Sequence, residues 1–160
     1  MTDVAIALLM LMVANGAPVL ATRLFDGHFD RPVDLGRRFT DGRPILGPNK
    51  TLRGVLVAVL ASAAIGVLLG LPWPAGALFG ASAMVGDLLS SFTKRRFDLA
   101  SGDRAFGLDQ LPESVLPLLT LRAFTDLGWT GFAVALIAFL GLGELLSRLL
   151  YAAGIRKRPY

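Results

Sequence analysis

Apolar segments long enough to cross a bilayer occupy most of this 160-residue chain. A membrane core of about 30 Å requires about 20 mainly apolar residues in helical conformation. Five segments approach this length, namely 4–22, 54–71, 73–92, 111–127 and 129–150. The fourth is the least apolar, because it contains Glu113, Arg122 and Asp126. The pattern predicts an all-α integral membrane protein with five transmembrane helices, in a single domain that covers residues 1–160.

Composition narrows the class of protein further. Hydrophobic residues make up 54% of the chain, whereas soluble domains average about 45–50% even when Gly is counted. Cysteine is absent and His28 is the only histidine, which excludes disulfide frameworks and makes zinc sites unexpected. The amino end, Met1-Thr2-Asp3, is acidic and precedes a long apolar run. We therefore expect a retained first span rather than a removable signal peptide.

The basic residues are distributed unevenly. Of the 16 Lys and Arg residues, all except Arg122 lie in the connections 23–53 and 93–110 or at the C-terminal end. Five spans place these three regions on one side, and the positive-inside rule makes that side cytoplasmic. The N-terminus is then outside and the C-terminus inside, in a multi-pass protein of the cell membrane. Topology is the simplest explanation of these cations, but it explains the two connections less well, because they also contain acids, glycines and prolines in a specific arrangement. We expect no nucleic-acid partner, and the tail also suits contact with anionic lipid.

Asp87 is the first candidate for chemistry, because it lies inside an apolar segment near its cytoplasmic end. A carboxylate at the middle of a membrane helix costs roughly 2.5–3.5 kcal/mol on the insertion scale, and less near the interface. Ser91 and Lys94 or Arg95 follow Asp87 on the same helical face. The simpler alternative is a structural ion pair with a neighbouring helix. Acids inside membranes more often have a functional task.

Asp109 is the second candidate, because it comes just before the fourth segment at the same expected depth as Asp87. Two carboxylates that face each other suit Mg²⁺, which prefers oxygen ligands and keeps water or phosphate in its other positions. With a triphosphate, this becomes the arrangement of phosphoryl-type transfer. Alternatively, Asp109 caps the fourth helix, with Pro112 in its first turn. The spacing is compatible with both roles.

The long connection 23–53 contains several glycines and cations. Glycine lets the backbone approach a ligand closely, and Lys50, Thr51 and Arg53 offer donors suited to phosphate. Neither a P-loop nor a dinucleotide-binding motif occurs in the chain. A connection of this length is usually functional or disordered.

Together these stretches resemble the CDP-archaeol synthases, which are integral membrane cytidylyltransferases related to the CDP-diacylglycerol synthases. Asn15-Gly-Ala-Pro18 is similar to that family's Ala-Asn-x-x-Pro. Residues 34–54 resemble its D-x-G-R…D-G…G…K-T-x-R-G loop. Gly86-Asp87, Ser91, Lys94-Arg95 and Asp109-Gln110 resemble its G-D-x-x-x-S-x-x-K-R…D-Q pattern. The resemblance covers nearly the whole chain.

The resemblance implies that CMP is transferred from CTP to a phosphatidic-acid-like membrane lipid, archaetidic or diacyl, with release of pyrophosphate. It implies Asp87, Asp109 and Lys94 as catalytic residues, the two acids holding Mg²⁺, with K⁺ as a further possible ion. It assigns CTP or phosphate binding to Ser91, Lys94, Arg95, Asn49, Lys50, Thr51 and Arg53. Asn15, Asp34, Arg37 and Asp41 are the candidates for the lipid headgroup or for shaping the loop.

Two other functions compete with this interpretation. One is a small membrane transport or binding protein in which Asp87 and Glu144 carry protons or cations, but it leaves the Gly/Lys/Arg loop unused. The other is a related enzyme that activates a different phospholipid. The sequence does not indicate the oligomeric state.

Overall fold

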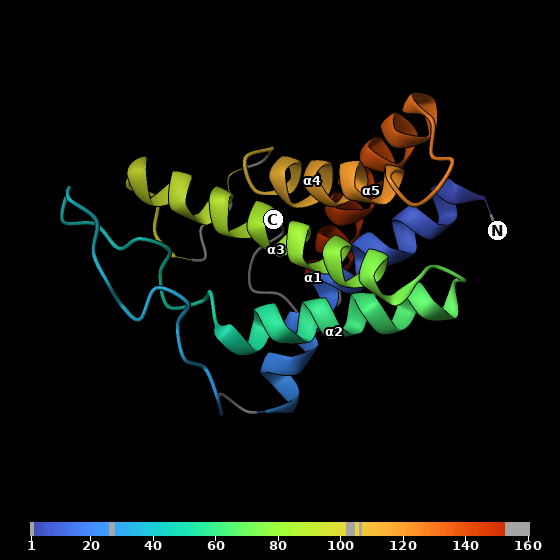
Figure 1. The fold of residues 1–160 in the computed structure, drawn as a ribbon. Helices are drawn as coiled ribbons and strands as arrows, with labels where there is room; N and C mark the ends of the chain where they lie inside the picture. Colours follow the sequence, from blue (N-terminus) through green and yellow to red (C-terminus); the bar gives the residue numbers. More distant parts are fainter. Residues whose placement is uncertain (1, 26–27, 102–104, 106, 153–160) are drawn as a thin grey trace.

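The computed structural model describes residues 2–25, 28–101, 105 and 107–152, with only the backbone described for 146–152. Five α-helices follow one another along the chain: α1 (Asp3–Leu24), α2 (Leu52–Leu68), α3 (Trp73–Arg96), α4 (Gln110–Arg122) and α5 (Trp129–Ala152) (Figure 1). Outside them, the described residues form only two isolated β-bridges, Pro32 with Thr51 and Arg38 with Pro44. The predicted all-helical architecture is confirmed. The basic end of the chain, 156–158, lies outside the described residues.

Two of the helices, α1 and α3, are long and apolar enough to cross a membrane by length and composition. Helix α2 and residues 129–145 of α5, the part of that helix whose side chains are described, are apolar but shorter. Helix α4 has 13 residues, which at 1.5 Å per residue is about 20 Å and less than a bilayer core. Five membrane crossings, and their orientation, therefore remain predictions.

The fourth segment ends earlier than the predicted 111–127, because its last residues turn back. Arg122 Nε donates a hydrogen bond to the Leu127 carbonyl at 2.9 Å, and its guanidinium lies 3.6 Å from the Trp129 ring centroid. Thr125 Oγ1 donates to the Leu121 carbonyl at 3.1 Å. These two side chains hold the turn that follows the end of α4. The apolar residues up to Leu127 thus continue the hydrophobic pattern without continuing the helix.

The second segment is displaced relative to the predicted 54–71. Helix α2 begins at Leu52, because the Thr51 hydroxyl caps it by accepting a hydrogen bond from the Gly54 N–H at 3.1 Å. It ends at Leu68, and Gly70 follows with a φ of +86°, a conformation that side chains disfavour. The chain then turns into α3 at Trp73.

Helices α2 and α3 pack through small residues. Ala58, Ser62 and Gly66 lie on one face of α2 and are buried. A Cβ at Gly76 would come within 2.4 Å of the Ser62 carbonyl oxygen, and one at Gly80 within 2.8 Å of the Ala58 carbonyl oxygen. Small residues at this spacing let helix backbones approach closely, as is common in membrane proteins.

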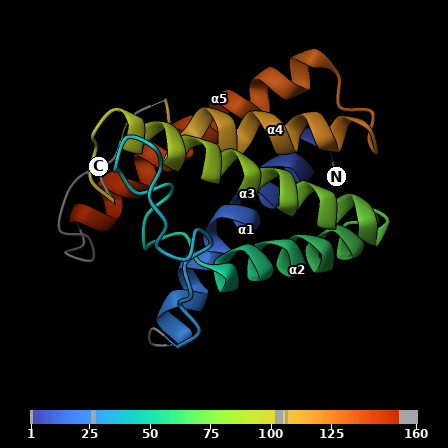
Figure 2. The same ribbon diagram turned by 60° about the vertical axis from the view of Figure 1, so that its left-hand side comes forward.

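Helices α3 and α4 also touch through their backbones. A Cβ at Gly86 would lie 2.1 Å from the carbonyl oxygen of Pro112, so the first turn of α4 sits directly on α3. The amino ends of α2 and α4, the carboxyl end of α3 and the connection 28–51 gather at one end of the bundle (Figures 1 and 2). This end carries the candidate residues predicted from the sequence.

Candidate active site

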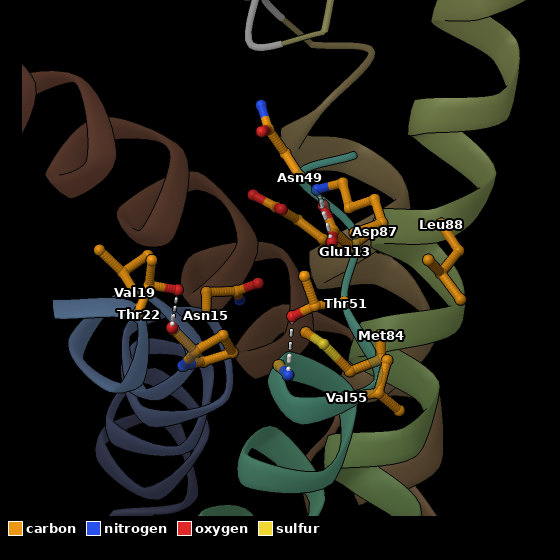
Figure 3. Close-up of a pocket in the computed structure, with 13 residues that line it drawn as sticks. Asn15, Val19, Thr22, Asn49, Thr51, Val55, Met84, Asp87, Leu88 and Glu113 are labelled. Carbon is orange, nitrogen blue, oxygen red and sulfur yellow. Dashed lines mark hydrogen bonds and ion pairs between the residues drawn. The ribbon is translucent and has the colours of Figure 1, made fainter. Parts of the chain in front are cut away.

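A cavity of about 330 Å³ opens between α1, the start of α2, α3 and α4, beneath the end of the long loop (Figure 3). Its polar lining comes from Asn15, Thr22, Asn49, Lys50, Thr51, Asp87 and Glu113. Its apolar lining includes Pro18, Val19, Val55, Met84 and Leu88. The cavity therefore combines charged groups from the loop, α3 and α4 with apolar side chains from α1, α2 and α3.

Asp87 pairs with a lysine from the long loop rather than from its own helix. Lys50 Nζ lies 2.6 Å from Oδ1 and 2.7 Å from Oδ2 of Asp87. The side chains are 25% and 22% exposed, so the pair is partly shielded from water. The loop thus supplies a cation to Asp87, the acid within the third apolar segment.

A second lysine–carboxylate pair joins α3 to the start of α4. Lys94 Nζ lies 2.6 Å from Oδ1 of Asp109, and the side chains are 9% and 20% exposed. Asp109 Oδ2 accepts a hydrogen bond from the Ala105 N–H at 3.0 Å. Its side chain forms no capping hydrogen bond to α4, so the capping alternative is not observed.

Glu113 is a member of the site that sequence analysis missed, because it was treated only as a charge within the fourth apolar segment. Its carboxyl lines the cavity near Asp87 (Figure 3). Its carboxyl is close enough to interact electrostatically with both lysine–carboxylate pairs, Lys50–Asp87 and Lys94–Asp109. The available signal was its spacing, since Glu113 follows Asp109 by four residues and so shares its helical face. Gly86 makes the placement possible by admitting the first turn of α4.

Ser91 and Arg95, both predicted to bind phosphate, are buried in α3 at 2% and 6% exposure. Arg95 Nη2 donates to the Ala100 carbonyl at 3.0 Å. Among the described residues, neither belongs to the cavity lining. Their predicted contact with phosphate stays a prediction.

Thr51 and Arg53 hold the start of α2 in place. Thr51 lines the cavity while it caps α2. Arg53 donates to the Thr22 hydroxyl at 3.1 Å and to the His28 carbonyl, and it pairs with Asp30. The Arg53 guanidinium therefore binds residues at and just after the end of α1. Arg53 is not among the residues that line the cavity.

Two asparagines line the cavity from opposite sides (Figure 3). Asn15, in the middle of α1, donates from Nδ2 to the Leu11 carbonyl at 3.0 Å, which orients its amide. Asn49 comes directly before Lys50 on the loop. Both amides offer neutral hydrogen-bonding groups beside the Lys50–Asp87 pair.

Asp34 organises the turn that leads to Lys50. Its carboxylate accepts hydrogen bonds from three backbone N–H groups, those of Gly36 at 2.9 Å, Leu46 at 2.8 Å and Gly47 at 3.0 Å. Burial on its own raises the pKa of Asp34, but these three hydrogen bonds outweigh burial and hold the pKa below its ordinary value. Asp34 thus shapes the loop rather than facing the cavity, whose described lining does not include it.

Asp34→Asn should loosen this turn. The amide keeps one acceptor oxygen and turns an N–H₂ group toward backbone donors, which costs about 1–3 kcal/mol for each donor left unpaired. Hydrogen exchange at the Leu46 and Gly47 amides should therefore speed up in the variant. Because the folded-state pKa is lowered, the wild-type carboxylate stabilises the loop above its ordinary pKa of 3.8 and loses this effect as pH falls through the folded value. Equal exchange in both proteins at neutral pH would contradict this role.

Residues 39–44 of the long loop are bound to the carboxyl end of α3 through Arg96. Arg96 pairs with Asp41 at 2.6 Å, donates to the Pro44 carbonyl, and lies 4.9 Å from the centroids of both the Phe39 and Phe92 rings. Asp41 is therefore committed to holding the loop. Arg37, by contrast, is exposed on the loop surface.

Comparison with known proteins decides the family. The family model described as "CarS-like: CDP-archaeol synthase" matches residues 1–72 and 74–156. The chain belongs to the CDP-archaeol synthase family. Named CDP-archaeol synthases include a protein from Pyrobaculum calidifontis, 35% identical over 92% of this chain and 91% of its own length. Another, from Methanopyrus kandleri, is 39% identical over 82% of this chain and 81% of its own length.

The fold of this CDP-archaeol synthase family member agrees with a solved structure. That protein is described as an intramembrane enzyme for archaeal membrane lipids biosynthesis. It matches with a TM-score of 0.73 and 34% identity, over 95% of this chain and 93% of its own. The chain is therefore a membrane enzyme of lipid biosynthesis, a CTP-dependent lipid cytidylyltransferase. Family membership replaces the alternative of a small transport or binding protein.

Proposed function

We propose that the enzyme transfers CMP from CTP to the phosphate of an archaetidic-acid-like lipid, whose isoprenyl chains are ether-linked. The observation that carries this proposal is the cavity with the Lys50–Asp87 pair at its edge. Charged groups suited to phosphates meet there with an apolar wall suited to a lipid. The ether-linked substrate follows the name that the relatives share.

The reaction joins two anions. An oxygen of the lipid phosphate forms a bond to the α-phosphorus of CTP, the bond from that phosphorus to the bridging oxygen breaks, and pyrophosphate leaves with the electron pair. A lipid phosphate is already ionised at neutral pH, so no general base is required. The main obstacle is charge repulsion, which Lys50 and Lys94 reduce by binding phosphate oxygens.

The donors present suit Mg²⁺. This ion is usually held by one or two carboxylates together with substrate phosphates and water. The described residues contain no group of three or more His, Cys, Asp or Glu side chains arranged for a metal. Asp87, which lines the cavity, and Asp109, which the described lining does not include, each supply one carboxylate that is paired with a lysine. When bound, Mg²⁺ neutralises charge on the phosphates. We therefore assign its ligands to Asp87 and Asp109.

The lipid reaches the cavity from the apolar side. Val19 on α1 lines the cavity and is 58% exposed. Leu20 beside it and Leu56 on α2 are also exposed. Apolar surface of this kind suits acyl or isoprenyl chains, while the phosphate of the same lipid points to Lys50.

The test is direct incorporation of labelled CMP. Purified protein receives α-labelled CTP, Mg²⁺ and, in separate reactions, an ether-linked isoprenyl lipid phosphate, an ester-linked diacyl lipid phosphate, or the isoprenyl lipid without its phosphate. Label should enter the first lipid fastest, and the lipid without phosphate should remain unlabelled. Preferential labelling of the diacyl lipid would contradict the proposed substrate.

The orientation has its own test. We propose that the loop end of the bundle faces the cytoplasm, because the basic residues of both long connections gather there. Ser101 is exposed at this end, and Ser101→Cys adds the single cysteine of the chain. A membrane-impermeant thiol reagent should label it only after the cells are opened. Labelling of intact cells would reverse the assigned orientation.

A further inference from the structure

Both carboxylates assigned to the metal are already occupied by lysines. Lys50 reaches both oxygens of Asp87, at 2.6 and 2.7 Å, and Lys94 reaches one oxygen of Asp109 at 2.6 Å. The same two lysines are the cations assigned to the phosphates. A metal at either carboxylate, or a phosphate at either lysine, must therefore replace a lysine–carboxylate contact, Lys50–Asp87 or Lys94–Asp109.

The Lys50 contact is built by the fold rather than by chance approach of a surface side chain. Asp34 fixes the turn at residues 46–47, and Thr51 caps α2 on the other side of Lys50. The Val33 N–H also donates to the Lys50 carbonyl at 2.8 Å. The backbone is held on both sides, whereas the ammonium stands on a flexible four-carbon stem.

We propose that Lys50 is a counter-ion lock, which keeps Asp87 closed to a free divalent cation and opens only when a nucleotide arrives with the metal. This inference rests on the proposed function, in which Asp87 is a metal ligand. The nucleotide opens the lock because its phosphates offer Lys50 a new anionic partner. Lys50 would thus admit a divalent cation to Asp87 together with the nucleotide rather than ahead of it.

Electrostatics makes the two cases unequal. A free divalent cation at Asp87 would leave the Lys50 ammonium without its partner beside a second cation, in surroundings only about a quarter exposed. Like charges repel strongly where water is partly excluded. A triphosphate brings enough negative charge for both the metal and the lysine. When the metal replaces Lys50 at Asp87, the Lys50 ammonium therefore gains a phosphate oxygen as its new partner. We expect the same of the Lys94–Asp109 pair at the start of α4, where Lys94 would leave Asp109 only for a phosphate.

The test measures Mn²⁺ binding without nucleotide, by electron paramagnetic resonance of the purified enzyme in detergent. Wild-type protein should bind Mn²⁺ weakly. Lys50→Met frees Asp87, so the variant should bind Mn²⁺ alone about tenfold more tightly or better. Lys50→Arg keeps a cation on Asp87 and should behave as wild type. Arg31→Met is the matched control, because Arg31 is an exposed cation of the same loop and should leave Mn²⁺ affinity unchanged.

Equal or weaker Mn²⁺ binding by Lys50→Met would overturn the lock. Lys50→Gln, which is smaller and polar, replaces it if the methionine variant does not fold. Wild-type protein gives an independent result: Mn²⁺ with CTP should raise its thermal midpoint, whereas Mn²⁺ alone should not. A clear rise with Mn²⁺ alone also overturns the lock. The lock can fail while CMP transfer is normal, whereas absence of CDP-lipid in the labelling assay is a failure of the proposed function.

Discussion

Asp87→Asn should lower CMP transfer by about 10³-fold, because in the proposed site the neutral amide removes a carboxylate that holds Mg²⁺, and such a ligand is worth several kcal/mol of charge stabilisation. Asp109→Asn should have a loss of similar size, since it removes the other assigned ligand. The measurement is the rate of labelled CMP incorporation into lipid phosphate at saturating CTP. Both variants should still insert into the membrane and elute as folded protein, because both carboxylates are partly exposed, at 22% and 20%, and the asparagine oxygen still accepts a hydrogen bond from the lysine.

The matched control is Asp126→Asn. Asp126 is an exposed acid in the turn between α4 and α5, at the far end of α4 from the cavity, and its loss should leave the rate unchanged. Near-normal activity of either Asp87→Asn or Asp109→Asn would exclude the two-carboxylate metal site. Loss of activity that extra Mg²⁺ restores would instead indicate weakened metal affinity with the chemistry intact.

Of the glycines that the structure describes, Gly86 is the one at which an added methyl group should be most damaging. The new Cβ would lie 2.1 Å from the carbonyl oxygen and 2.4 Å from the carbonyl carbon of Pro112, and 2.7 Å from the Glu113 nitrogen. These are backbone atoms, so no side-chain rotation relieves the clash. Overpacking of this kind typically costs about 1–3 kcal/mol. The thermal midpoint in detergent should fall, and transfer activity should fall with it because Asp109 and Glu113 move away from α3.

Gly141→Ala provides the comparison. Gly141 lies in α5 and a Cβ there meets nothing within 4 Å. Replacing an unobstructed helical glycine by alanine leaves stability unchanged or raises it by about 0.4–1 kcal/mol. A wild-type thermal midpoint and activity for Gly86→Ala would show that α4 does not depend on close contact with α3.

The helices were predictable from sequence because their signal is local. The start of α3 at Trp73 follows from the turn before it and from the apolar run behind it. The predicted fourth segment extends to Leu127, whereas α4 ends at Arg122. Hydropathy does not reveal this, because Leu127 is equally apolar in a helix and in the turn where its carbonyl accepts a hydrogen bond from Arg122. The small-residue contact between α2 and α3 was visible in the spacing of Gly76 and Gly80, which sequence analysis left unused.

The site was predictable in its members more than in its pairings. Asp87 and Lys94 share a helical face, yet each pairs with a residue from another element, Lys50 and Asp109 respectively. Those partners depend on the path of the loop, which is set by hydrogen bonds between residues far apart in sequence, as at Asp34. Local periodicity contains no information about such bonds. The phosphate-binding roles of Ser91, Arg95 and Arg53 stay predictions.

The glycines of α3 also determine which parts of the enzyme are able to move. Gly76 and Gly80 place α3 backbone to backbone with α2, and Gly86 does the same with α4. Contacts of this kind contain few flexible side chains that change rotamer and absorb a displacement. Helices α2, α3 and α4 therefore shift together or not at all. We therefore expect entry of the lipid substrate and exit of its bulkier product to depend on movement of α1, α5 and the loop.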